Sequence, residues 1–331
     1  MWPKVRIWLS CVILSLLAVY GVFAVSVPKQ PVVNSESFPK AGYVSLDYIV
    51  TFEDVEQLPP AMARATALLR SGHFQQAAVA FRAIQHVSPS EALSYRGENE
   101  ASRSLSTLDM TITRDQQLVS AADAHAGSVS NAYRAALHYG LGDALTMKNY
   151  ATPIGETPYD LGPEPKQQLI EAIRLRPNLL EAHLALAAYY EHGSQRQGTA
   201  ARREYDVCLR LRPDLYQVRY LHAASWDRPG FLLNEAQLAG RGFSITDDEK
   251  SMPQRAVSEC LSLIQDHPDY PPPYYKLGSD YADPRYPIHN DIQAKQYLSV
   301  YAKIGDPTLE WWQYATAEVQ TIDREVAKSH G

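Results

Sequence analysis

The stretch Leu180-Glu-Ala-His-Leu-Ala-Leu-Ala-Ala-Tyr-Tyr190 is the clearest helical segment of the chain. A second helical run follows it and ends at Leu209-Arg-Leu-Arg-Pro213, where the proline closes the helix. The same layout returns at Pro272-Pro-Tyr-Tyr-Lys-Leu-Gly-Ser-Asp-Tyr281, which is again followed by an amphipathic run. The repeat of this layout predicts successive pairs of helices.

Weaker copies of the pattern cover other parts of the chain. The first runs from about Leu58 to Pro89, and Ala77, Phe81 and Ile84 lie on its second helix. Their spacing of i, i+4 and i+7 places them on one helical face. The small side chain of Ala77 lets the backbone of the partner helix approach, and the ring of Phe81 fills the groove beside it.

Residues 90–130 fit the pattern poorly, because Arg96 to Ser104 is polar and contains Gly97. We expect a degenerate helix pair in this region. Two further copies begin near Asn131 and Tyr216, and their second helices are predicted from Pro165 to Leu175 and from Pro253 to Pro268.

Helix, turn, helix and closing proline at a period of about 34 residues resemble the tetratricopeptide repeat. The resemblance implies an all-α fold, a right-handed α-solenoid of about four or five degenerate TPR-like helix pairs. It covers residues 57–307. Residues 308–331 are predicted to form a capping helix, with Trp311, Trp312 and Tyr314 facing inward and Asp323 and Arg324 outward.

The N-terminal segment 1–27 predicts one transmembrane helix. Lys4 and Arg6 precede an uncharged run from Ile7 to Val27, which as a helix spans about 30 Å, the thickness of a hydrocarbon core. The run is longer than a typical signal-peptide core, so we favour an uncleaved anchor over cleavage near Ala24-Val-Ser26. The short basic tail favours a cytoplasmic N-terminus, with the soluble body outside, in the periplasm of a bacterium.

Residues 28–56 contain three prolines among polar residues and are predicted to be a linker. The whole chain is 45% hydrophobic and 21% charged, which is typical of a globular protein. Its net charge of -6 argues against binding nucleic acid, which requires a basic face. Three cysteines are too few for a disulfide framework, and we expect Cys208 and Cys260 to be buried thiols.

The motifs of common enzyme classes are missing from the sequence. It contains no Gly-x-Ser-x-Gly elbow, His-Glu-x-x-His zinc motif or Gly-x-x-x-x-Gly-Lys phosphate loop. Gly140-Leu-Gly142 is better explained by close helix packing than by dinucleotide binding. His183 and His192 lie nine residues apart, which places them on opposite faces of a helix. We therefore expect no catalytic residue, no cofactor and no metal.

Four loops within the predicted pairs are lengthened, at 148–164, 192–199, 227–252 and 282–291. In a stacked solenoid such loops emerge on one edge, so we expect them to form a composite surface. Their prolines restrict the backbone and their aromatic residues supply contact area. The aromatic candidates for partner binding are Tyr159, Phe231, Phe243 and Tyr286. Variable loops without function remain the alternative.

A second set of candidates lies on the first helices, on the face that lines the groove in the family. It consists of Tyr139, Asp143, Glu181, Tyr220 and Tyr275. The alternative is that the tyrosines belong to the core. The paired Lys and Asn with which some members grip a C-terminal carboxylate are absent, because Tyr275 and Ser279 occupy the equivalent positions in one repeat.

Together with the predicted anchor, the resemblance implies a membrane-anchored scaffold or assembly factor that binds protein partners, with membrane-associated proteins expected among them, through its groove or its loop edge. One alternative is a permanent structural subunit of a membrane protein complex. A small-ligand-binding protein that uses the tyrosine-rich groove is the third possibility, and its signature would be a defined pocket with convergent polar groups.

Overall fold

The computed structural model describes residues 58–150, 163–192, 198–226, 252–284, 286–307 and 310–329. Within these ranges the chain forms helices and no strands, so the described part has an all-α fold. The predicted anchor 1–27 and linker 28–56 lie outside it, as do Tyr159, Phe231 and Phe243. None of the described helices combines the length and the apolar character needed to cross a bilayer.

The helices follow one another with short connections wherever the connection is described. Their bounds are α3 Pro60–Arg70, α4 Phe74–Val87, α5 Ala92–Ser104, α6 Leu108–Ala124, α7 Asn131–Tyr150, α8 Pro163–Leu175, α9 Leu180–His192, α10 Gly198–Leu211, α11 Tyr216–Ala224, α14 Met252–Asp266, α15 Pro272–Ala282, α16 Asp291–Ile304 and α17 Glu310–Ser329.

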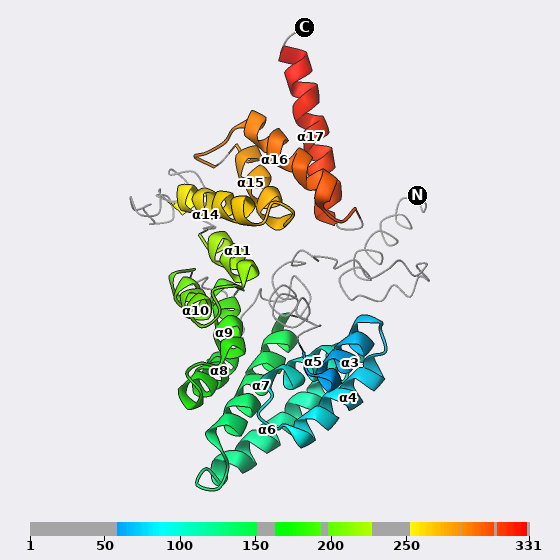
Figure 1. Ribbon diagram of the computed structural model, residues 1–331, viewed down its shortest axis with the longest axis vertical. Coiled ribbons are helices and arrows are strands. Elements are labelled where there is room, and N and C mark those ends of the chain that lie inside the picture. Colours follow the sequence, from blue (N-terminus) through cyan, green and yellow to red (C-terminus); the bar gives the residue numbers. More distant parts are fainter. Residues whose placement is uncertain are drawn as a thin grey trace, which may run out of the picture.

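Packing between the helices is local in sequence. Each helix packs on the next described helix, from α3 and α4 to α16 and α17. Alternate helices also touch, in the pairs α3 with α5, α5 with α7, α7 with α9, α11 with α15, and α15 with α17. The helices therefore form a curved row, in which α3–α7 occupy one end, α8–α11 the middle and α14–α17 the other end (Figure 1).

The first helix pair shows why this sequence folds into paired helices. Gly72 closes the turn between α3 and α4 with φ +78°, a left-handed conformation that suits glycine. On α4, Ala77 and Phe81 are completely buried and Ile84 is partly buried, as their spacing predicts. Phe81 reaches the next pair, because its ring lies against Gly97 on α5.

Glycines at the helix crossings make close approach possible. A Cβ added at Gly142 on α7 would lie 3.0 Å from Leu169 Cγ on α8, and one at Gly278 on α15 would lie 2.5 Å from Leu298 Cγ on α16. A Cβ at Gly140 would lie 2.8 Å from Tyr95 Cβ. Small-residue packing therefore explains Gly140 and Gly142, in place of a nucleotide fingerprint.

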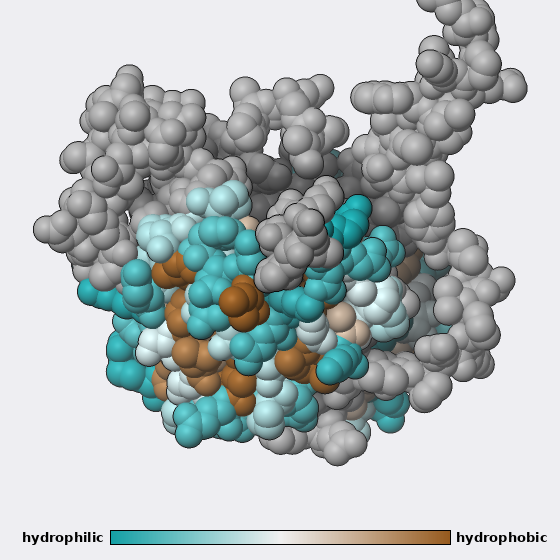
Figure 2. Space-filling model, turned by 90° about the horizontal axis from the view of Figure 1, so that it is seen from above, coloured by the Kyte–Doolittle hydropathy of each residue, from teal (hydrophilic) through white to brown (hydrophobic). Residues whose placement is uncertain are grey.

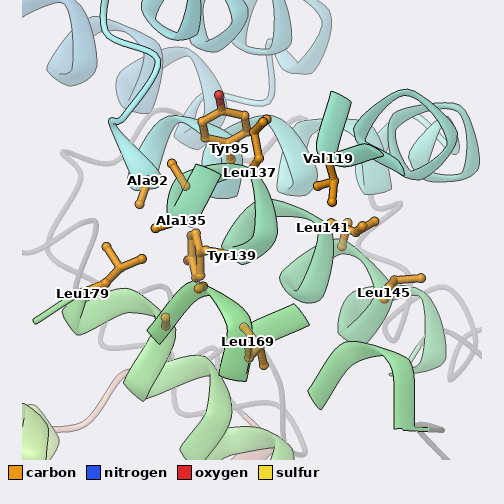
Figure 3. Close-up of a cluster of buried hydrophobic side chains, with 14 of the residues drawn as sticks. Ala92, Tyr95, Val119, Ala135, Leu137, Tyr139, Leu141, Leu145, Leu169 and Leu179 are labelled. Carbon is orange, nitrogen blue, oxygen red and sulfur yellow. The ribbon is translucent and has the colours of Figure 1, made fainter. Parts of the chain in front are cut away.

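The largest core cluster lies between α5, α6, α7 and α8. Figure 3 shows side chains from these helices converging, with Tyr139 of α7 pointing into the cluster together with Leu141 of the same helix. Leu169 of α8 and Leu179, which precedes α9, close the cluster from the other side. Core residues thus come from neighbouring helices along the chain.

Residues 90–130 do form a helix pair, α5 and α6, as the weak pattern predicts. The C-terminal helix α17 is also present, with Trp311 and Trp312 partly buried and Asp323 and Arg324 exposed. The inward orientation predicted for Tyr314 holds in part, because its ring contacts that of Tyr275 on α15 while 44% of the residue is exposed. The helical turn that buries Ala315 leaves Tyr314 at the border of the packed face.

Exposed hydrophobic side chains are dispersed over the described surface. The most exposed are Val87 on α4, Met110 on α6 and Ile292 on α16, three helices that do not follow one another. Seen from above in Figure 2, hydrophobic residues are likewise interspersed with hydrophilic ones. Such scattered residues are normal on a protein surface and do not mark a site.

Candidate functional site

The sequence-predicted groove residues lie on successive first helices. Tyr139 and Asp143 are on α7, Glu181 on α9, Tyr220 on α11 and Tyr275 on α15. Tyr139, Asp143, Tyr220 and Tyr275 are buried, with 3%, 3%, 6% and 9% of each residue exposed. The structure does not bring these five residues together in one pocket; they are distributed along the row of helices.

Asp143 belongs to a buried polar network between α5 and α7. Arg96 Nη1 donates to Asp143 Oδ1 at 2.5 Å, and Asn99 Nδ2 donates to Asp143 Oδ2 at 2.9 Å. The Asn99 amide also donates to the Gly140 carbonyl at 2.9 Å. Buried charges persist in proteins when they are paired and hydrogen-bonded, and this network meets that condition across two neighbouring helix pairs.

A second ion-pair group joins α4, α5 and α6 around Glu98. Its carboxylate accepts hydrogen bonds from Arg82 Nε at 2.6 Å, from Gln85 Nε2 at 2.9 Å and from Arg114 Nη1 at 2.5 Å. Burial alone would raise the pKa of Glu98, but the hydrogen bond and charge of Arg114 outweigh it and the pKa lies below its ordinary value. The Glu98 group therefore ties three helices together as an ionised carboxylate.

The pKa of Asp115, which lies beside this group, is shifted in the opposite direction. It accepts hydrogen bonds from the Arg114 guanidinium at 2.6 and 2.9 Å, but only 1% of the residue is exposed. Burial is the largest effect and raises the pKa of Asp115 to about 6 in spite of the Arg114 charge. The carboxyl group of Glu98 is therefore ionised more easily than usual, and that of Asp115 less easily.

Burial also shifts the pKa values of Glu181 and Tyr139. Burial raises the pKa of the Glu181 carboxyl above its ordinary value. It also raises the pKa of the Tyr139 hydroxyl, to which the nearby charge of Asp143 contributes as well. Since Tyr139 lies in the core cluster, its ring contributes to packing between helix pairs.

A cleft of about 620 Å³ opens between α15 and α17. On the α15 side it is lined by Tyr275, Ser279 and Asp283, and on the α17 side by Trp311, Tyr314 and Glu318. The Tyr275 ring centre lies 5.2 Å from that of Trp311 and 6.1 Å from that of Tyr314, at steep angles of 63° and 69°. Edge contacts of this kind hold aromatic rings in fixed orientations.

Residues of the loop edge meet at one place in the described part. Tyr286 from the insert 282–291 packs with Met252 and Trp226, which flank the insert 227–252. Arg202 of α10 lies over the Trp226 ring, 4.0 Å from its centre, and Arg202 Nη2 donates to Thr199 Oγ1 at the end of the insert 192–199. The ends of three inserts are therefore neighbours.

Within the described residues, no group of three or more His, Cys, Asp or Glu is arranged to hold a metal ion. His183 instead hydrogen-bonds through Nδ1 to Glu204 Oε2 at 2.6 Å and through Nε2 to the Pro177 carbonyl at 2.9 Å. Cys208 and Cys260 are buried thiols, as the sequence predicts, and burial raises the pKa of Cys208.

Sequence reasoning identified Tyr275 and Asp143 but missed their partners. The polarity of α5 was a usable signal, since a helix with Arg96, Glu98 and Asn99 in a repeat core requires charged partners nearby. No local signal connects Tyr275 with Glu318, because their proximity depends on the packing of α17.

A comparison of the sequence with models of protein families finds no match, and a search of curated proteins finds none either. The fold and the two surfaces just described are therefore the basis for assigning a function.

Proposed function

We propose that this chain is a membrane-anchored helical-repeat protein of the tetratricopeptide type, which binds protein partners as a scaffold or assembly factor. The observation that supports this most strongly is the order of contacts, in which first helices pack on successive first helices, as α5 does on α7 and α7 on α9. Stacked helix pairs of this kind build extended surfaces that suit protein recognition.

Two described features offer candidate surfaces for the partner. One is the aromatic cleft between α15 and α17. The other is the loop edge, where Tyr286, Met252 and Trp226 bring the ends of the long inserts together. The second feature supports the idea that the inserts act as one composite surface, since loops that begin and end side by side can be contacted by one partner.

The proposed mechanism is equilibrium binding without chemistry. A surface built on packed helices is ordered before the partner arrives, so mainly the partner loses conformational freedom. The uncharged run Ile7 to Val27 supports a membrane anchor, which would keep the body near membrane-associated partners and raise their effective concentration.

Affinity capture from native membranes in mild detergent tests the proposal. The bait is the tagged full-length protein, and the matched control is a tagged fragment of residues 1–56, which retains the anchor and linker and lacks the helical body. We expect membrane proteins to be enriched on the full-length bait at sub-stoichiometric amounts, as measured by quantitative mass spectrometry.

Other outcomes of this experiment have distinct meanings. One partner set at a fixed ratio would identify a permanent subunit of a membrane complex instead of an assembly factor. No enrichment above the anchor control would contradict protein binding and would favour a small-ligand-binding protein.

The orientation is tested separately with protease added to intact bacterial spheroplasts. With the N-terminus in the cytoplasm, the body faces the periplasm and is digested without lysis. A body that resists digestion until the cells are lysed would show the opposite orientation.

A further inference from the structure

In two of the described turns, a tyrosine joins one helix pair to the next. The hydroxyl of Tyr95 on α5 donates to the carbonyl of Pro89, the proline that follows α4, at 3.0 Å. The hydroxyl of Tyr274 on α15 donates to the carbonyl of Pro268, which follows α14, at 2.9 Å. Both side chains lie six residues after the proline, and burial raises the pKa of both tyrosines above its ordinary value. These two hydrogen bonds are therefore independent of pH in the neutral range.

The turn between α8 and α9 has a histidine at the same spacing. His183 lies six residues after Pro177 and is 5% exposed, and its Nε2 is 2.9 Å from the Pro177 carbonyl oxygen. Its other ring nitrogen, Nδ1, is 2.6 Å from Oε2 of Glu204 on α10. The ring therefore joins α9 to two elements that pack beside it, the turn after α8 and the helix α10 (Figure 1).

Both hydrogen-bond partners of the His183 ring are acceptors. A carbonyl oxygen and a carboxylate oxygen have no hydrogen to donate, so each bond requires a proton on the ring nitrogen. A neutral imidazole has one N–H group, whereas an imidazolium has two. The arrangement is therefore complete only when His183 carries a positive charge. In the neutral ring, one nitrogen would present its lone pair to an oxygen at hydrogen-bond distance.

The surroundings of His183 favour the charged ring. Burial by itself lowers the pKa of His183, but the hydrogen bonds to Glu204 and to the Pro177 carbonyl outweigh burial, and the pKa lies above its ordinary value. Two charged groups act most strongly on the ring, and both lie on α10: Glu204 raises the pKa and Arg210 lowers it. His183 thus changes its charge near neutral pH, where a tyrosine does not.

We infer that His183 is a proton-dependent clasp, which holds the turn after α8 and the helix α10 to α9 while both of its ring nitrogens carry a proton. Loss of one proton leaves the charge-assisted bond to Glu204 and breaks the bond to Pro177, so the junction loosens. Because the pKa is raised in the folded protein, the stabilisation is complete below about pH 6.5 and is lost as the pH rises through the folded value. Acid therefore tightens the middle of the row of helices.

Hydrogen exchange followed by mass spectrometry tests the clasp in the full-length protein in mild detergent. Exchange of the imidazole C2 hydrogen measures the titration of each histidine, and amide exchange measures the opening of each turn. We expect the titration midpoint of His183 to lie above about 6.5. After correction for the intrinsic effect of pH, the amides of residues 176–183 should exchange about threefold faster or more at about pH 8.5 than at about pH 6, and those of residues 89–95 and 268–274 less than about 1.5-fold faster.

Three variants separate the clasp from general effects of pH. Glu204→Gln keeps an acceptor for Nδ1 and removes the charge that favours the imidazolium, so the midpoint of His183 should fall and the threefold difference should shrink. His183→Tyr introduces the residue that joins the other two turns, and it should remove the pH dependence at residues 176–183. His125→Gln is the matched control, because His125 is exposed and its ring bonds to the Ala121 carbonyl at the end of its own helix. This control should leave exchange at residues 176–183 unchanged.

A titration midpoint of His183 at or below about 6.5 would overturn the inference, because the ring would then be neutral where the clasp is expected to be closed. Equal pH dependence of amide exchange at all three turns would also overturn it. So would an unchanged pH dependence at residues 176–183 in Glu204→Gln, a variant that keeps the size of the side chain and is expected to fold even if His183→Tyr does not.

Discussion

The Arg96 guanidinium on α5 and the Asp143 carboxylate on α7 lie 2.5 Å apart although 47 residues separate them in sequence. Their side chains are 2% and 3% exposed, so this pair lies inside the contact between two successive first helices. Removal of one member would leave the other as a buried charge with fewer partners, which is more damaging than loss of the attraction itself.

Asp143→Ala should therefore lower the free energy of unfolding by about 3–5 kcal/mol. Urea unfolding of a fragment of residues 57–331, followed by circular dichroism, measures this. Asp266→Ala serves as the control, because the ion pair of Asp266 with Arg219 has side-chain exposures of 50% and 31% and should contribute about 1 kcal/mol or less. Equal effects of the two substitutions would contradict a structural role for Asp143.

Gly97 provides a test of helix packing. A Cβ at this position would lie 2.3 Å from Cζ of the Phe81 ring, far inside van der Waals contact. In a free helix Gly97→Ala would gain about 1 kcal/mol from helix propensity. At this crossing we expect a net loss of about 1–3 kcal/mol, because the Phe81 ring must move.

Two variants check this explanation by thermal unfolding. Gly127→Ala is the control, because nothing lies within 4 Å of an added Cβ there, and it should leave the melting temperature nearly unchanged. Phe81→Leu combined with Gly97→Ala should recover part of the stability, since the smaller side chain leaves room. A stable Gly97→Ala protein would mean that α4 and α5 are not packed as described.

Helix pairs were predictable from the sequence where small and large residues recur at fixed spacing. Leu180–Tyr190 and Pro272–Tyr281 both fall within single helices, α9 and α15. The same reasoning placed Ala77 and Phe81 in the core, where both are fully buried. Such predictions succeed because they depend on contacts between residues close in sequence.

The ion-pair network was not predictable in the same way. Arg96 and Glu98 made α5 resemble a poor core helix, since the residues that pair with them lie on α4, α6 and α7. Likewise, the cleft exists only because α17 packs against α15, which no local pattern predicts. Tyr314 lies at the border of the packed face of α17, where helical periodicity alone does not determine how exposed a residue is. Both features depend on tertiary contacts that a repeat pattern does not contain.

Shortening residues 229–250 to a tight turn tests the loop edge. The segment lies outside the described residues, but its flanks Trp226 and Met252 pack with Tyr286, so a short link can join the existing ends. We expect the helical signal and the melting temperature to change little and the capture of partners to fall. Unchanged capture would show that the loop edge does not bind the partner.

The pH dependence of stability provides a test of Asp115. Its pKa rises from 3.8 to about 6 on folding, chiefly through burial, and this difference corresponds to about 3 kcal/mol. The folded protein therefore binds a proton that the unfolded chain does not bind between about pH 4 and 6. From this residue alone, stability is highest below about pH 4 and decreases as the pH rises through 6.

Asp115→Asn keeps the shape of the side chain and removes its titration. Relative to the unmodified protein, the variant should become more stable by up to about 3 kcal/mol as the pH is raised from 4 to 7. Glu98, with its lowered pKa, acts in the opposite sense at low pH, and it is present in both proteins. Urea unfolding at several pH values measures the difference, with Asp109→Asn, at a side chain that is 76% exposed, as the control. Parallel stability curves for Asp115→Asn and the unmodified protein would mean that Asp115 is ionised throughout, held so by Arg114.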